Sequence, residues 1–172
     1  MQLRGKTQRM VFLSMLIACA MVLSYFERFI PLPWNAPGMK LGLANIITLS
    51  SFYFFRKRDV FLVVLLRVVL TSLIIGSMLS FFYSLAGGIL SFIGMGLLHQ
   101  FFKKTISPIG ISIVGAILHN IGQLIVLTVI SERLTIALSY APLIMVAGIA
   151  TGVFVGIAST YFMKAVPLTQ LK

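Results

Sequence analysis

The stretch that decides the fold is PWNAPGMKLGLAN, residues 33–45, where a proline-rich loop passes into an apolar run. Lys40 and Asn45 stand at the start of that run, where a membrane helix would begin. Charged and amide groups are costly inside a bilayer, so they usually face the interior of a helix bundle and serve a purpose. The stretch therefore predicts a membrane helix whose outer end carries a polar site.

The composition places the whole chain in a membrane. Hydrophobic residues make up 59% of the 172 residues and charged residues only 10%, and the mean hydropathy is +1.07, far from soluble proteins. The basic residues form short clusters between apolar runs, and no nucleic-acid-binding motif joins them. We predict one integral membrane domain over residues 1–172, surrounded by the lipid bilayer and without a nucleic-acid partner.

The length of the apolar runs predicts the number of helices. A bilayer core about 30 Å thick needs roughly 20 apolar residues per helix. Applied along the chain, this length predicts an all-α membrane protein, a compact bundle of six transmembrane helices. The expected spans are residues 10–27, 39–55, 60–78, 81–101, 109–130 and 141–163.

The basic residues predict the orientation of these spans. With six spans and a cytoplasmic N-terminus, ten of the 14 Lys and Arg residues fall on one side. Loops rich in Lys and Arg stay on the cytoplasmic side, and an odd number of spans would scatter the asymmetry. We therefore expect both termini in the cytoplasm and the protein in the plasma membrane of a bacterial-type cell.

Lys40 and Arg67 are the cations within or beside the expected spans. Lys40 either extends its amine to the outer headgroups or faces a ligand. Arg67 lies seven or eight residues inside the third span, where reaching the headgroups is strained. It either pairs with Glu27 or Glu132 or meets an anionic ligand.

A third polar group lies in the fifth span, in GAILHNIGQL, residues 115–124. His119 and Gln123 are four residues apart and share a helix face, with Asn120 adjacent. A single histidine more often bridges two helices by hydrogen bonds, but three such groups within five residues favour a lined cavity. The predicted substrate-binding residues are Lys40, Asn45, Arg67, His119, Asn120, Gln123 and Trp34.

The first outer loop carries the only tryptophan, Trp34, among three prolines that exclude a helix and stiffen the chain. The loop either covers a cavity that opens outward or anchors the protein at the membrane interface. The excess of cations over acids favours an anionic or carbonyl-rich substrate. Side chains that could stack on a ring are Tyr25, Phe26, Trp34, Phe81, Phe82 and Tyr83.

Small residues four apart mark faces where helices approach closely in lipid. The first span has two such pairs, Ser14 with Ala18 and Ala20 with Ser24. They either pack within the bundle or dock another membrane subunit. Three glycines at the same spacing in the last span predict packing inside the bundle.

The sequence contains few of the side-chain combinations that catalysis requires. Prenyl-transfer chemistry needs aspartate clusters for magnesium and diphosphate, and the only aspartate is Asp59. A nucleophile beside a base, paired carboxylates and metal ligands are also missing. We predict no catalytic residue, no metal site, no cofactor in this chain and no enzymatic activity.

Two motifs, PGMKLGLANIITL at residues 37–49 and GAILHNIGQL, resemble the S components of energy-coupling factor (ECF) transporters. With the six-span layout and Ser14–Ala18, they are similar to the Gx transporter branch, also labelled heptaprenyl diphosphate synthase component I. The resemblance implies a subunit that binds a vitamin-like compound from outside under a lid, here Pro31–Gly38. It also implies partners: a transmembrane coupling subunit that docks on Ser14 and Ala18, and two cytoplasmic ATPases that use ATP.

The predicted function is therefore the uptake of a small anionic or aromatic compound, vitamin-like or quinone-precursor-like, as the substrate-binding subunit of an ECF importer. The alternative is a membrane-embedded accessory subunit of a prenyl-diphosphate or quinone biosynthesis or electron-transfer assembly. Proteins that purify with the chain would separate the two.

Overall fold

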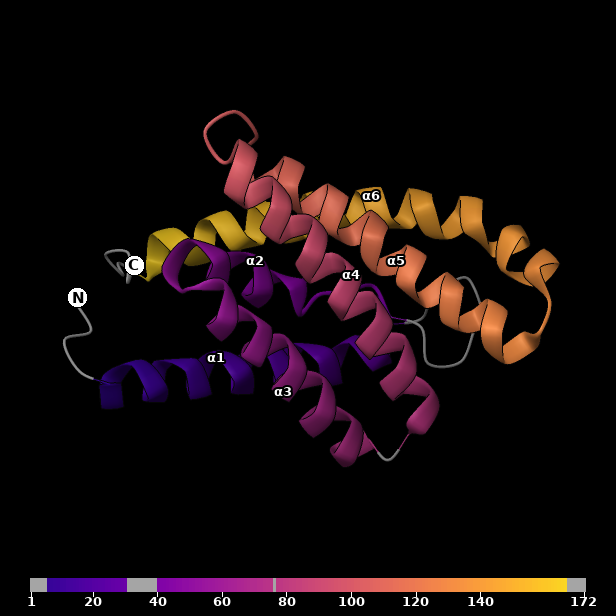
Figure 1. The fold of residues 1–172 in the computed structure, drawn as a ribbon, viewed down its shortest axis with the longest axis horizontal. Helices are drawn as coiled ribbons and strands as arrows, with labels where there is room; N and C mark the ends of the chain where they lie inside the picture. The colour runs from indigo at the N-terminus through magenta and orange to yellow at the C-terminus, as the bar shows by residue number, and fades with distance from the viewer. Residues whose placement is uncertain (1–5, 31–39, 76, 167–172) are drawn as a thin grey trace.

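The fold is all-helical, as the sequence predicts (Figure 1). The computed structural model describes residues 6–30, 40–75 and 77–166. These residues form six α-helices, one short 3₁₀ helix and no strand. The elements are α1 (Lys6–Phe26), η1 (Glu27–Phe29), α2 (Asn45–Phe54), α3 (Lys57–Ile75), α4 (Met78–Phe102), α5 (Pro108–Ser131) and α6 (Leu134–Ala165).

The second predicted span is wrong in length. A full span was expected over residues 39–55, but α2 has 10 residues, about 15 Å of helix and half of a bilayer core. Lys40, Leu41 and Gly42 precede it in irregular backbone, and Gly42 has a φ of +87°, which favours glycine. Lys40 therefore lies on a non-helical segment, and Asn45 begins the helix instead of lying deep within it.

The longer helices are those that the hydropathy indicates. Within the described residues, α1, α4, α5 and α6 are long and apolar enough to cross a membrane. The last helix begins seven residues before the predicted span 141–163 and contains Pro142. The predicted turn around residues 76–80 is short: α3 ends at Ile75 and α4 begins at Met78, with residue 76 outside the described residues.

Helix boundaries follow local capping chemistry. Ser77 and Ser107 precede α4 and α5, and each side-chain hydroxyl accepts a backbone N–H bond from three residues further on, at 3.2 Å in both cases. Pro108 occupies the first turn of α5, where its missing N–H costs no helical bond. These caps fix where the two helices begin.

Basic residues gather at one end of the bundle. The starts of α1, α3 and α5 and the ends of α2, α4 and α6 lie toward the left of Figure 1. At this end Arg9 of α1 pairs with Asp59 of α3, and Lys57 donates a hydrogen bond to Gln100 of α4. An even number of crossings is consistent with this shared end.

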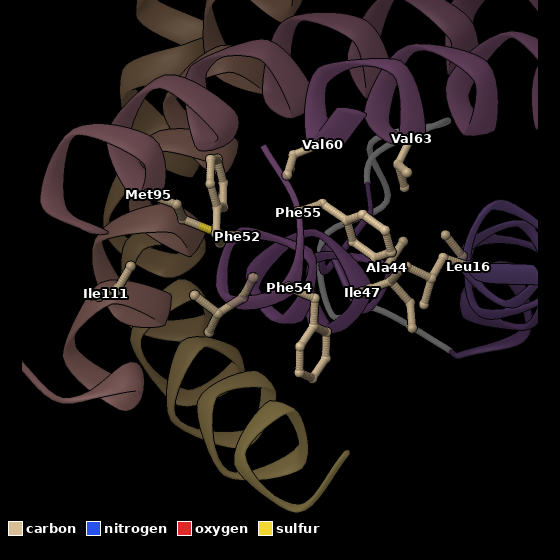
Figure 2. Packing of buried hydrophobic residues seen from close by; sticks show 12 residues of the cluster. Leu16, Ala44, Ile47, Phe52, Phe54, Phe55, Val60, Val63, Met95 and Ile111 are labelled. Atoms are coloured by element: carbon tan, nitrogen blue, oxygen red, sulfur yellow. The ribbon is translucent and has the colours of Figure 1, made fainter. Parts of the chain in front are cut away.

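The short helix α2 is the centre of the bundle and contacts α1, α3, α4, α5 and α6. Eight of its ten residues are buried. Its apolar side chains form one cluster with residues of the surrounding helices, and Figure 2 shows Phe52 beside Met95 of α4. In lipid, close packing rather than exclusion of water holds such helices together. A helix surrounded on all sides can position polar groups away from lipid.

Glycines bring α4, α5 and α6 into close contact. A Cβ added at Gly152 or Gly156 of α6 would lie 2.6 Å from a Cα atom of α5. A Cβ at Gly122 of α5 would lie 2.7 Å from the backbone of Ala86 and Gly87 in α4. Substitution at these positions would force the helices apart, as expected for small-residue packing.

The two small-residue pairs of α1 face different ways. Ala20 and Ser24 are buried against the bundle, whereas Ser14 and Ala18 are exposed. The exposed pair lines an apolar groove with Met10, Val11 and neighbouring residues. The first span thus packs inward through one pair and leaves the other on its outer face.

Candidate functional site

A small polar cavity lies between five helical elements of the bundle and one non-helical segment. Its walls come from α1 and η1, the segment before α2, and helices α3, α4 and α5. Three residues of the predicted site, Lys40, Arg67 and His119, line this one cavity. The other lining residues are Ser24, Glu27, Gly42, Val68, Thr71 and Ser84.

The non-helical segment that carries Lys40 is held by two side chains from different helices. The Gln123 amide accepts the backbone N–H of Lys40 at 3.2 Å and donates to its carbonyl oxygen at 2.8 Å. The buried carboxylate of Glu27 accepts backbone N–H bonds from Gly42 and Leu43. Irregular backbone at membrane depth needs such partners because lipid supplies none.

Asn45 accepts a hydrogen bond from Arg67. Arg67 is 4% exposed and Asn45 is 2% exposed, and the guanidinium donates to Asn45 Oδ1 at 3.3 Å. Asn45 is not among the residues that line the cavity. Its position indicates that it orients the Arg67 guanidinium in the wall.

Two glycines make room for the ring of His119. A Cβ at Gly87 of α4 would lie 2.8 Å from the imidazole, and one at Gly42 would lie 3.4 Å from it. His119 is therefore seated between α4 and the segment before α2, with 3% of its surface exposed. These contacts place the ring in the wall of the cavity.

Several polar atoms of the cavity have no hydrogen-bond partner within the described part of the chain. They are Arg67 Nε, Thr71 Oγ1, Ser84 Oγ and both ring nitrogens of His119. Most buried polar groups in proteins are paired, and each exception needs an explanation. Groups from three helices that converge unpaired on one space are what a polar ligand would satisfy.

The cavity is nearly closed in this conformation. The centre of a water molecule can reach about 10 Å³ of it, roughly the room for one water. A larger molecule therefore requires the walls to move. Lys40 and Gly42 belong to the one non-helical wall segment among the described residues, so hydrogen bonds from side chains, not a helix, hold that part.

The remaining predicted residues lie elsewhere. Gln123 binds the backbone of Lys40, as described above. Asn120 donates to the carbonyl oxygen of Ile144 at 2.7 Å and joins α5 to α6. Trp34 and the predicted lid Pro31–Gly38 lie outside the described residues. A ligand-binding role for each predicted residue stays a prediction.

Four residues that line the cavity were not predicted from the sequence as site residues: Glu27, Ser24, Thr71 and Ser84. Glu27 appeared only as a partner for Arg67, although an acid at the end of an apolar run was a visible signal. Ser24 was assigned to a packing pair, and Thr71 and Ser84 were passed over. Hydroxyls are common in membrane helices, where they often bond to their own backbone, so composition does not single them out.

Within the described residues, no three His, Cys, Asp or Glu side chains are grouped as a metal site would require. Asp59 is engaged by Arg9 at the basic end, far along α3 from Arg67. The chemistry that this cavity can perform is recognition by charge and hydrogen bonds.

The fold and the cavity define a multi-pass, all-α membrane protein with a buried polar site between its helices. The sequence matches heptaprenyl diphosphate synthase component I over residues 16–162, and the chain belongs to this family. Its structure is similar to a solved structure of the S component of a bacterial ECF transporter. The TM-score is 0.56 and the identity 24%, over 94% of each chain.

This likeness establishes a shared fold and confirms the resemblance drawn from the two sequence motifs. No curated protein matches the sequence. Family and fold are thereby fixed, and the substrate has to be inferred from the cavity.

Proposed function

We propose that this protein is the substrate-binding membrane subunit of an ECF-type importer in the plasma membrane. The observation that carries the proposal is the buried cavity lined by Arg67, Lys40 and His119, in a fold shared with an S component. A site closed around unpaired polar atoms suits capture of a small molecule, here of an anionic, vitamin-like kind.

The exposed face of α1 supports the partner part of the proposal. Ser14 and Ala18 leave a shallow apolar groove on the outer side of the helix. Small residues at this spacing allow another membrane helix to approach closely. The partners would be a transmembrane coupling subunit on this face and two cytoplasmic ATPases, which supply the energy.

The family description favours a second candidate, an accessory subunit of a prenyl-diphosphate-forming assembly. The three acids of the chain argue against catalysis by the chain itself. Glu27 binds backbone N–H groups, Asp59 binds Arg9, and Glu132 lies at the turn before α6. None of them forms the paired carboxylates that hold magnesium and diphosphate.

Co-purification and uptake separate the two candidates. We expect the full-length chain, extracted in mild detergent, to bring down a coupling subunit and ATPases, and Ser14→Leu to abolish this without unfolding the protein. Cells that carry these subunits should import a compound that also raises the melting temperature of the purified chain. Capture of a soluble prenyl synthase without ATPases, and no import, would refute the uptake proposal.

Arg67→Ala tests the site itself. Loss of the guanidinium should weaken ligand binding while the protein still inserts in the membrane, because the hydrogen bond that the Arg67 guanidinium donates goes to the uncharged amide of Asn45. An unchanged affinity in a thermal-shift titration would remove Arg67 from the site.

A further inference from the structure

An apolar groove lies between α1 and α3 beside the polar cavity. The two helices are in contact and cross each other in Figure 1. The groove has a volume of about 380 Å³, within the range of ligand-binding pockets. Its described lining is almost entirely apolar and consists of α1 side chains from Ala18 to Phe26, about 12 Å along the helix, and of Thr71 and Ile74 on α3. At Ala18 it meets the groove of the proposed docking face.

Thr71 lines both the groove and the polar cavity, so the two spaces adjoin at this residue. Arg67, Thr71 and Ile74 follow one another at spacings of four and three residues, which places them on one face of α3. Arg67 lines the cavity and Ile74 lines the groove. This face of the helix therefore changes from a cation to a hydroxyl to an apolar side chain over about 10 Å.

The hydroxyl of Thr71 indicates what kind of molecule crosses this junction. Thr71 is 4% exposed, and its hydroxyl has no hydrogen-bond partner within the described part of the chain. A buried hydroxyl without a partner costs free energy, and a purely apolar chain in the groove would leave it unpaired. A molecule that is polar on the cavity side of Thr71 and apolar on the groove side satisfies both environments.

The charge and the size of the cavity indicate which part of such a molecule it holds. Arg67 and Lys40 are cations, and Glu27 is the acid among the described lining residues. This lining has a net positive charge whether the Glu27 carboxyl is charged or neutral, which favours an acidic group. The centre of a water molecule can reach only about 10 Å³ of the cavity, so the rest of a larger ligand has room in the adjoining groove.

We infer that the ligand is a single-chain amphiphile, with a small acidic head group in the polar cavity and an apolar chain in the groove between α1 and α3. This inference rests on the proposed function and names the substrate class of the same cavity. Arg67 and Lys40 hold the acidic group, the Thr71 hydroxyl pairs with the head group where the chain begins, and Val22 and Ile74 contact the chain.

Photolabelling of the full-length protein in phosphatidylcholine nanodiscs tests where the chain lies. The probe is dodecanoate with a photoreactive diazirine in its chain, at a pH where the acid is ionised, and mass spectrometry locates the labelled residues. We expect the label on residues 18–26 and 71–74. Unlabelled dodecanoate should suppress it. Dodecanol, which lacks the acidic group, and butanoate, which lacks the long chain, should suppress it severalfold less at the same concentration.

Two neighbouring substitutions form a matched pair. Ile74 lines the groove and is 65% exposed, whereas Leu73 is 74% exposed and lines a separate groove between α3 and α4. Ile74→Trp should fill the groove and reduce the labelling severalfold, and Leu73→Trp should leave it unchanged. Arg67→Ala should also reduce it, because the head group loses a cation. If that variant does not fold, the comparison of dodecanoate with dodecanol tests the same contact.

The inference is overturned if dodecanol or butanoate suppresses the labelling as strongly as dodecanoate, because the chain alone or the head group alone would then explain it. Labelling that Arg67→Ala leaves unchanged would assign the groove to bilayer lipid and overturn it too. Equal effects of Ile74→Trp and Leu73→Trp, or label confined to other helices, also overturn it.

The coupling subunit is the other possible occupant of the groove. If Ile74→Trp prevents capture of that subunit and leaves the labelling unchanged, the groove belongs to the partner and the inference is wrong. Import of a water-soluble compound without an apolar chain, by the chain with its coupling partners, would leave the proposed function standing and refute this inference alone.

Discussion

Thr71→Val is expected to have opposite effects on the stability of the ligand-free protein and on its affinity for the ligand. Thr71 is 4% exposed, lines the cavity, and its hydroxyl has no partner within the described residues. A buried polar atom left unpaired costs about 1–3 kcal/mol, and valine keeps the branched shape of threonine. We therefore expect the ligand-free variant to be more stable than the wild type by about 1 kcal/mol or more.

The same substitution should weaken binding. A ligand that pairs with Thr71 gains a hydrogen bond with a net value of about 0.5–1.5 kcal/mol, so its loss corresponds to a roughly two- to tenfold lower affinity. In a protein of this size, 1 kcal/mol shifts the melting temperature by about 2–4 °C. Thermal unfolding in detergent, with and without a ligand identified by thermal-shift screening, measures both effects.

Thr48→Val is the matched control. Thr48 of α2 is 1% exposed, and its hydroxyl also lacks a partner within the described residues, but it is not among those lining the cavity. This variant should gain stability in the same way and keep its affinity for the ligand. A lower melting temperature for ligand-free Thr71→Val, or an equal loss of affinity in both variants, would refute the reasoning.

Two further substitutions test the framework of the site. Gln123→Ala removes both hydrogen bonds to the backbone of Lys40, which should cost about 1–3 kcal/mol and speed hydrogen exchange at the Lys40 amide; unchanged exchange would contradict the assignment. Gly122→Ala places a Cβ 2.7 Å from the backbone of α4. The melting temperature should therefore fall by an amount equivalent to about 1–3 kcal/mol. An unchanged melting temperature would show that α4 and α5 can move apart without a loss of stability.

The long helices could be predicted from the sequence because apolar length alone determines them. The half-length of α2 could not, because residues 39–55 carry no charge after Lys40 and hydropathy does not register a break in the backbone. The helix is interrupted at Gly42, which adopts a positive φ. The backbone N–H groups of this segment are bound by the Glu27 carboxylate and the Gln123 amide, which are distant in the sequence. Only contacts across the bundle reveal these partners.

The candidate site was partly predictable for a similar reason. A cation such as Arg67 in the middle of an apolar helix is conspicuous, because burying its charge is costly. Asn120 and Gln123 have the same composition signal as His119, yet their amides bind backbone groups of α6 and of the Lys40 segment. The difference between lining a cavity and bracing it depends on which helix lies opposite, and periodicity does not specify that.

The unpaired polar groups of the cavity lower the stability of the ligand-free protein and also provide hydrogen-bond partners for a ligand. Apolar residues in place of Thr71 and Ser84 would pack the same helices with no polar atom to desolvate, so the fold alone gives no reason for these hydroxyls. Sites that reduce stability are expected where binding requires them. A ligand that pairs with these atoms offsets the free energy that their burial costs, and it stabilises the closed form more as its concentration rises. The bonds from Glu27 and Gln123 to the segment of Lys40 and Gly42 then set how readily that form opens.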